Sequence, residues 1–482
     1  MIPPICVKYK VEHWIEISSA FYFVERMVRL VRNTMNFVDL CRGEFGRKVA
    51  YTGVDRITPQ NVVKVVSDTI GIHNRNRTLI DYLYRYMKGD QPILYRNKIV
   101  RPEVNNRVVE NHAFETVKFK AGLICGEPIQ YVCKKKNADK KINEQVDLLN
   151  DYLDEANADA RNIQRAIYQS ATGTSYKAIL KEEDWTKNGD LPPFRIFIPY
   201  PGDCYIVYSQ RNGKPMLSVQ ILKDEDEQQY YLCYSKNQFF EIKNGKVTNY
   251  GINGFGGIPI VECPNNHDRL SDVEIAITLF DAINKYQSDR LNGVEQFVQS
   301  FMKFKNCEVD KNEFLEMVKL GAISVKDTGN GCQSDVELMT AELNQSESQV
   351  AKDDMPNRQS NSGGDTGNAV YLRNGWDFAE RDAKLVEAFT KEAEKESARV
   401  ILNIIRGTSK DVNISTRDFD VKITRNPTDN MLVKAQALDY LFKNKIHPLI
   451  ALITCGLFSD PQKVYEMSLP YLGTIYPELA DP

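Results

Sequence analysis

The sequence predicts an α+β protein that is mainly helical, and three observations lead to this expectation. Apolar residues recur at helical spacing along two long stretches, 271–303 and 377–406. Residues 194–262 are instead rich in β-branched and aromatic residues. Between the two helical stretches lies the polar, glycine-containing segment "SNSGGDTGNAVYL", from Ser360 to Leu372. We therefore expect long helices, a separate antiparallel sheet and one long loop.

Composition sets limits on the function. The chain has 482 residues, of which 42% are hydrophobic and 26% charged, so it can form several hydrophobic cores and about two to four domains. The formal net charge is −3. A protein that grips nucleic acid by its phosphates usually has a basic excess. This protein can surround nucleic acid, but its composition does not favour tight binding.

Metal and catalytic patterns are not evident. The ten cysteines form no C-x-x-C pair, and the five histidines show no metal-ligand spacing, so neither a zinc site nor a compact disulfide framework is expected. Free thiols in a reducing cytoplasm fit this pattern. We find no Ser-His-Asp pattern, Walker pair or paired metal carboxylates. The sequence predicts no enzyme, no cofactor and no metal.

The N-terminal stretch does not read as a signal peptide, because Lys8, Lys10, Glu12 and His13 interrupt its apolar residues. No segment approaches the roughly 18 uncharged apolar residues that a membrane-spanning helix needs. We expect a soluble, intracellular protein.

The first part of the chain reads as helices. Thr58 is a possible N-cap ahead of Pro59, and Gly89 stops a helical pattern. The basic run 134–141 reads as a solvated loop. The expected elements are helices at 15–50, 57–71, 77–88 and 142–172, and a helix running into a strand at 106–133.

The β-rich region reads as an antiparallel meander at about 194–262. Asn212-Gly213 and Asn244-Gly245 are strong hairpin-turn signals between its strands. The acidic run 224–227 also lies at a turn. Acidic clusters can bind Mg²⁺, but a run at a hairpin tip is more simply a solvated turn.

A long helix is expected from Ser271 to about Lys303. Ser271 and Glu274 form a capping-box pattern, in which Ser271 caps the helix and Glu274 reaches back to it. About 30 residues would span about 48 Å. Gly293 inside this pattern suggests a bend or close packing. A helix of this length with a narrow apolar face needs neighbours to cover it.

The rest of the chain alternates short and long elements. A small mixed insert at 306–336 contains a strand from Ala322 to Val325. The other expected elements are helices at about 338–355 and 377–406, a strand that ends at Pro427, and helices within the tail, 428–482.

The glycine-containing loop raises the question of phosphate binding. A Walker A loop needs a Lys ahead of its helix, but Asn368 follows Gly367 here, and no strand–helix–strand context is present. A flexible loop between two helices is the simpler interpretation. Loops of this length are usually functional or disordered.

The order of these pieces resembles the portal proteins of tailed bacteriophages, of the siphovirus type found in phages of Gram-positive hosts. The resemblance covers about residues 57–470, whereas the first 50 residues are less characteristic and the glycine-containing loop departs from the family. Three stretches carry it: "YLYRYMKGDQPILYR" with "VNNRVVENHAFETVKFKAGLICGEPIQY", then "GGIPIVECPNNHDRLSDVEIAITLFDAINKYQSDRLNGVEQF", and last "FDVKITRNPTDNMLVKAQALDYL".

The resemblance implies the phage portal fold in a ring homo-oligomer, usually of about twelve subunits. It implies a wing, a two-helix stem, a small α/β clip, a tunnel loop with a long helix, and a helical crown. The implied ranges are 1–270 for the wing, 271–305 for stem helix 1, 306–336 for the clip, 337–355 for stem helix 2, 356–406 for the tunnel loop and long wing helix, and 407–482 for the crown.

The implied function is that of a head–tail connector at one capsid vertex. Double-stranded DNA would enter through its channel during packaging and leave during ejection. The implied partners are further copies of the chain, the terminase large subunit, a head–tail adaptor, and scaffolding and major capsid proteins, without a membrane. The protein would belong to the virion and assemble in the host bacterial cytoplasm.

The resemblance also assigns sites. The tunnel loop would present Asn357, Arg358, Gln359, Ser360, Asn361, Ser362, Gly363 and Gly364 to DNA. The clip residues for terminase or adaptor would be Glu308, Asp310, Lys311, Lys319, Lys326 and Asp327. Lys303 and Lys305 either line the channel with positive charge or form a solvated helix end.

A physical argument agrees with the assignment of the tunnel loop to a DNA channel. A wall with many phosphate contacts would hold the duplex through counterion release. A polar loop whose one basic residue is Arg358 would touch DNA and release it.

Two alternatives remain open. One is a metal-dependent nucleic-acid hydrolase that uses the acidic run or His267-Asp268, with activity lost on replacing Asp224 or Asp268. The other is a different minor capsid or tail protein that oligomerises through its long helices.

Overall fold

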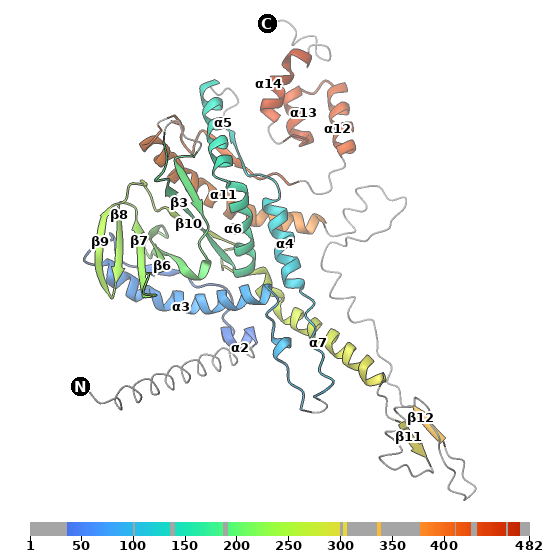
Figure 1. The fold of residues 1–482 in the computed structure, drawn as a ribbon. Helices are drawn as coiled ribbons and strands as arrows, with labels where there is room; N and C mark the ends of the chain where they lie inside the picture. Colours follow the sequence, from blue (N-terminus) through green and yellow to red (C-terminus); the bar gives the residue numbers. More distant parts are fainter. Residues whose placement is uncertain are drawn as a thin grey trace, which may run out of the picture. The chain divides into compact units, whose positions relative to one another are not determined.

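The structure is a computed structural model (Figure 1). The residues that it describes are 36–99, 102–134, 140–186, 191–298, 302–305, 335–338, 376–409, 411–425, 431–458 and 461–472. The chain divides into two compact units. The smaller unit comprises Met1–Met35, Gln91–Glu110 and Thr278–Asp354, and the larger one comprises Asn36–Asp90, Asn111–Ile277 and Met355–Pro482.

A six-stranded sheet in the larger unit contains the expected meander. Its strand order is β1-β5-β6-β7-β8-β9, with β5 to β9 paired antiparallel in sequence order. Asn244 and Gly245 both have positive φ, as a tight hairpin turn requires. The bounds are β1 Ala50–Thr52, β5 Cys204–Ser209, β6 Pro215–Lys223, β7 Gln229–Ser235, β8 Gln238–Lys243 and β9 Lys246–Ile252.

The expectation of one meander over 194–262 is wrong at both ends. Strands β4 (Phe194–Phe197) and β10 (Ile260–Pro264) flank β3 (Thr174–Lys181) in a separate three-stranded sheet. Strand β1 also pairs in parallel with β5, across more than 150 residues of chain. Pairings between distant segments leave no local turn signal, so the sequence pattern could not assign them.

Helices α3 (Val62–Met87), α6 (Ala158–Thr172) and α11 (Trp376–Gly407) pack against these sheets. Helix α2 (Phe37–Cys41) contacts α3, α4 (His112–Cys125) contacts α6, and α5 (Lys140–Glu155) contacts strand β2 (Gln130–Cys133). Residues of α4, α5, α6, β4 and α11 share one hydrophobic core. Residues of α3 share another with the six-stranded sheet, where Val62, Val207 and Phe240 are fully buried.

The expected helix at 15–50 is wrong at its end. Helix α2 stops at Cys41, and Arg42 takes a left-handed conformation with φ of 54°. Gly43 also has positive φ, so the helix is broken before β1 begins. Residues 1–35 lie outside the described part.

The C-terminal part contains the expected strand and two expected tail helices, but the strand ends at Lys422 and not at Pro427. Strand β13 (Phe419–Lys422) pairs antiparallel with β2 (Gln130–Cys133). Helices α12 (Met431–Lys443) and α13 (Pro448–Cys455) are the expected ones, and α14 (Pro461–Leu472) was not expected. The β13–β2 pair joins a strand from the range assigned to the crown to one from the range assigned to the wing.

Helix α7 runs from Asp272 to Val298, 27 residues, and its part from Thr278 onward belongs to the smaller unit. The unit also contains the short helix η1 (Pro92–Tyr95) and strands β11 (Met302–Lys305) and β12 (Asp335–Leu338), which pair antiparallel. The expected helix to about Lys303 is therefore too long. The sequence "MKFK" alternates apolar and charged residues, which is the period of a strand.

Most of the expected clip and second stem helix lies outside the described residues, as does the strand expected from Ala322 to Val325. Residues 337 and 338 belong to β12, so a second stem helix would begin after them.

Candidate functional site

Most residues assigned to the site lie outside the described part of the chain. The tunnel-loop residues from Asn357 to Gly364 lie outside the described part of the chain. The six clip residues, from Glu308 to Asp327, also lie outside it. Their roles stay predictions.

Lys303 and Lys305 lie on strand β11 and not at a helix end. Residues two apart in a strand share one face, so these two positions are on the same face of β11. Opposite them in the register are Glu337 and Asp335 of β12. The two lysines expected to supply positive charge therefore lie on a strand that is paired with acidic residues of β12.

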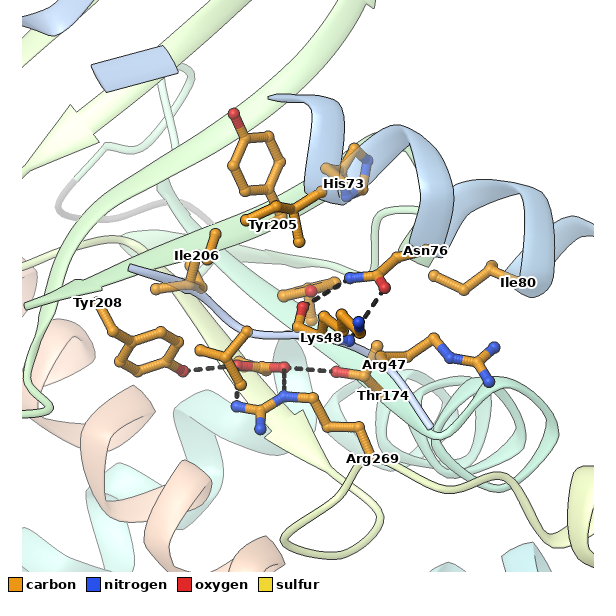
Figure 2. A pocket seen from close by; sticks show the side chains of 15 residues that line it. Arg47, Lys48, His73, Asn76, Ile80, Thr174, Tyr205, Ile206, Tyr208 and Arg269 are labelled. Carbon is orange, nitrogen blue, oxygen red and sulfur yellow. Dashed lines mark hydrogen bonds and ion pairs between the residues drawn. The ribbon is translucent and has the colours of Figure 1, made fainter. Parts of the chain in front are cut away.

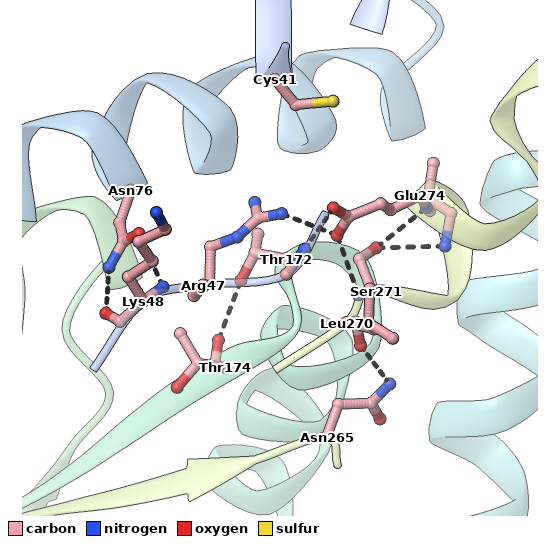
Figure 3. Close-up of polar contacts among 12 residues, drawn as sticks. Cys41, Arg47, Lys48, Asn76, Thr172, Thr174, Asn265, Leu270, Ser271 and Glu274 are labelled. Atoms are coloured by element: carbon pink, nitrogen blue, oxygen red, sulfur yellow. Dashed lines mark hydrogen bonds and ion pairs between the residues drawn. The ribbon is translucent and has the colours of Figure 1, made fainter. Parts of the chain in front are cut away.

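The start of α7 is held by the capping box that the sequence predicts (Figure 3). Ser271 Oγ accepts hydrogen bonds from the backbone N–H of Val273 at 3.1 Å and of Glu274 at 3.4 Å. Glu274 Oε2 accepts from the Ser271 N–H at 3.2 Å. Ser271 Oγ also lies 2.7 Å from the Ala171 carbonyl oxygen, to which it can donate. The cap thus joins α7 to the end of α6.

Glu274 has a second role that the sequence did not reveal. Its carboxylate accepts from the Gly46 N–H and from Arg47 Nη2, both at 2.7 Å, and the ion pair is fully buried. Burial lowers the pKa of Arg47 below its ordinary value, against the opposing effect of Glu274. The segment ahead of β1 is thereby fixed to the first turn of α7.

The loop ahead of α7 is fixed by another buried ion pair (Figure 2). The Arg269 guanidinium donates to both carboxylate oxygens of Glu262, at 2.7 and 3.0 Å. Tyr208 and Thr174 also donate to this carboxylate. Burial opposes the charge, but Arg269 and these hydroxyls hold the pKa of Glu262 below its ordinary value. The cluster joins the six-stranded and the three-stranded sheet to the loop.

A small cavity lies beside this cluster, between α3, β5 and the segment at Arg47 (Figure 2). Its volume is about 20 Å³, which accommodates about one water molecule. A nucleotide or other substrate needs several hundred Å³ (about 300 or more). This cavity is therefore not a substrate site.

His73 lines the cavity and is almost fully buried. Its ring stacks on Tyr205 with centroids 4.5 Å apart, and its Nε2 donates to the Gly202 carbonyl oxygen at 2.8 Å. Burial lowers the pKa of His73 to about 4, so the folded protein holds it neutral at physiological pH.

This depressed pKa makes stability depend on pH. Between the ordinary pKa of 6.5 and about 4, the unfolded chain binds a proton that the folded chain does not, so stability falls as pH drops through this range. The expected loss from this group is about 3 kcal/mol. Urea unfolding at pH 7 and pH 4.5 should show a smaller pH dependence for His73→Gln than for the wild type. His267→Gln, at an exposed position, is the control, and an equal effect of the two substitutions would contradict the assignment.

The smaller unit contains a polar seam between α7 and the segment 105–110. Three backbone N–H groups, two residues apart, donate to three side chains of α7, four residues apart. The bonds join Asn106 N to Asn292 Oδ1 at 2.7 Å, Val108 N to Ser288 Oγ at 2.9 Å, and Glu110 N to Asn284 Oδ1 at 2.8 Å. The spacings match, because four helical residues rise about 6.0 Å and two extended residues about 6.6 Å.

Further contacts extend the seam. Gln91 accepts from Asn284, and both side chains are fully buried. Arg96 forms an ion pair with Asp289 at 2.8 Å. The seam joins two of the stretches that carry the sequence resemblance, the one with "QPI" and "VNNRVVEN" and the one with "DAINKYQS". The polar residues of the two stretches are therefore accounted for by the hydrogen bonds that they form with each other.

Helix α11, which follows the expected tunnel loop in the chain, is fixed by a buried charge cluster. Glu394 is 1% exposed and has two cations beside it. Lys177 Nζ lies 2.8 Å and Arg165 Nε 3.8 Å from its carboxylate oxygens, and the Tyr131 hydroxyl donates to it at 3.1 Å. Burial opposes ionisation, but the two cations hold the pKa of Glu394 below its ordinary value.

The hydrolase alternative gains no support from the geometry. Among the described residues, no group of three or more His, Cys, Asp or Glu side chains is placed to hold a metal ion. The acidic run 224–227 lies at the turn between β6 and β7, where the Gln228 N–H donates to Asp224 at 2.8 Å. Within the described part of the chain, no helix is both long and apolar enough to span a bilayer.

Comparison with known proteins finds a matching family and similar solved structures. The family described as "Phage portal protein, SPP1 Gp6-like" matches residues 67–357. A chain of the solved structure "Neck of empty GTA particle computed with C6 symmetry" is similar at 11% identity, over 72% of this chain and 90% of that chain, with a TM-score of 0.37. No curated protein sequence matches the chain.

Proposed function

Because the chain belongs to the phage portal protein family, SPP1 Gp6-like, we propose that it forms the portal ring at one vertex of a phage capsid. The observation that carries this proposal is the family match over residues 67–357, more than half of the chain. Proteins of this family are structural components of the virion and are not enzymes.

In this proposal about twelve copies surround a channel for double-stranded DNA. The channel admits DNA during packaging and releases it during ejection, and the terminase large subunit and then a head–tail adaptor dock on the clip. Scaffolding and major capsid proteins contact the wing. The phage is of the siphovirus type and its host Gram-positive, as the sequence resemblance implies.

Exposed apolar side chains on α7 support assembly of copies. Ile275 is 66% exposed and Leu279, one turn further along, is 39% exposed. Exposed apolar residues one turn apart on a helix lie on the same face, so a neighbouring copy packed along α7 would remove both from water. In a ring, each copy would cover this surface of the next.

The test is negative-stain electron microscopy of the purified protein, with its mass in solution measured alongside. We expect a closed ring of about a dozen copies with a channel wide enough for duplex DNA, roughly 20 Å or more. Ile275→Lys should reduce ring formation, because it places a charge on the covered surface. Ile252→Lys on β9, where Ile252 is 87% exposed, is the matched control and should assemble normally.

A stable monomer or dimer, at concentrations where rings should form, would contradict the portal proposal. Metal-dependent nuclease activity would then be measured on the wild type and on Asp224→Asn and Asp268→Asn.

A further inference from the structure

One side chain joins the starts of two long helices, α7 and α11. Lys120 of α4 places its Nζ 2.7 Å from Asp272 Oδ1, at the first residue of α7. The same Nζ lies 3.1 Å from Asp382 Oδ2, in the second turn of α11. One ammonium group therefore bridges carboxylates from two helices that are about 100 residues apart in sequence.

The bridge is partly buried and its α7 end is built in. The Lys120 and Asp272 side chains are 11% and 13% exposed, whereas Asp382 is 52% exposed. Asp272 also accepts from the Ser170 hydroxyl at 2.6 Å and from Asn265 Nδ2 at 3.1 Å. On the α7 side the carboxylate is therefore buried and hydrogen-bonded, whereas on the α11 side it is half exposed.

Charge explains why the lysine matters to both helices. Without Lys120, two carboxylates would face a common space and repel each other. Burial disfavours the ammonium, but Asp272 and Asp382 outweigh it and raise the pKa of Lys120 above its ordinary value. The lysine is therefore charged at physiological pH.

A second cation contacts α11 but not α7. It allows a loss of stability in α11 alone to be separated from a loss of the connection between α11 and α7. Arg425 forms ion pairs with Glu380 and Glu387 of α11, and its side chain is 7% exposed. Among the described residues, it has no contact with an acidic group of α7. Arg425 therefore stabilises α11 alone, whereas Lys120 connects α11 to α7.

We propose that Lys120 is a positioning residue that couples the first turn of α7 to the first turns of α11. The functional meaning rests on the proposed portal function. There, α11 follows the range assigned to the tunnel loop in the chain, so the bridge connects the helix after that range to α7.

Hydrogen exchange of the full-length assembled protein tests the coupling. Peptides covering 272–285 and 376–390 are followed by mass spectrometry. Lys120→Met should speed exchange in both helices by about fivefold. Asp382→Asn, whose change lies on α11, should also speed exchange at the start of α7. Lys120→Arg should restore near-normal exchange in both, since the charge and reach are kept.

Arg425→Met is the matched control, and it should speed exchange in 376–390 alone. The coupling is wrong if Asp382→Asn leaves 272–285 unchanged, or if Lys120→Arg exchanges as fast as Lys120→Met. It is also wrong if Arg425→Met affects both helices equally, because the effect would then be general loosening.

The same variants keep this proposal distinct from the portal proposal. Failure of the wild type to form rings would count against the portal function. Coupled exchange between α7 and α11 would still be measurable in that protein. A normal ring without coupled exchange would overturn the role of Lys120 alone.

Discussion

Glu394→Gln is expected to lower the free energy of unfolding by about 3–5 kcal/mol. The substitution keeps the size of the side chain but removes the carboxylate that pairs with Lys177 and Arg165. All three side chains are almost fully buried, so two cations would stay in a low-dielectric interior without their counter-charge. Urea unfolding followed by circular dichroism measures the loss.

The control for this prediction lies two residues further along α11. Glu396 pairs with Arg399, and both side chains are about half exposed. Glu396→Gln should change stability by less than about 0.5 kcal/mol, since exposed pairs contribute little. If the two substitutions have equal effects, the Glu394 cluster does not fix α11 in the way described.

The positions of most regular elements could be predicted from the sequence, because their signals are local. The capping box at Ser271 and Glu274 needs only two residues three apart, and the structure confirms it. The Asn244-Gly245 turn and the strands on either side are confirmed for the same reason. The end of α7 was placed too late, because the strand pattern "MKFK" that follows is only four residues long.

Buried charges could not be located from sequence. Nothing near Glu394 in the chain distinguishes it from Glu396, since Lys177 and Arg165 are more than 200 residues away. Asn284 and Ser288 read as ordinary polar positions of a solvated helix face until the segment 105–110 is placed beside them. Their polarity is explained only by three-dimensional contact. The tunnel loop and clip, by contrast, still rest on the sequence resemblance.

Gly173→Ala is the second change with a large expected effect, a loss of about 3 kcal/mol or more. Gly173 ends α6 with φ of +84°, which an L side chain adopts only at a cost. A Cβ there would also lie 2.0 Å from the Arg269 carbonyl oxygen. That atom is backbone and cannot swing away. The loop ahead of α7 would have to move, and the Arg269–Glu262 pair and the Ser271 cap would move with it.

Gly213 separates the two causes of this loss. It has φ of +67° in the turn between β5 and β6, and a Cβ there would meet no atom within 4 Å. Gly213→Ala should therefore cost about 1 kcal/mol from backbone conformation alone. The difference between the two losses, measured by urea unfolding, gives the cost of moving the loop. Equal losses would mean that the loop yields freely and that the contacts around Arg269 do not hold the start of α7.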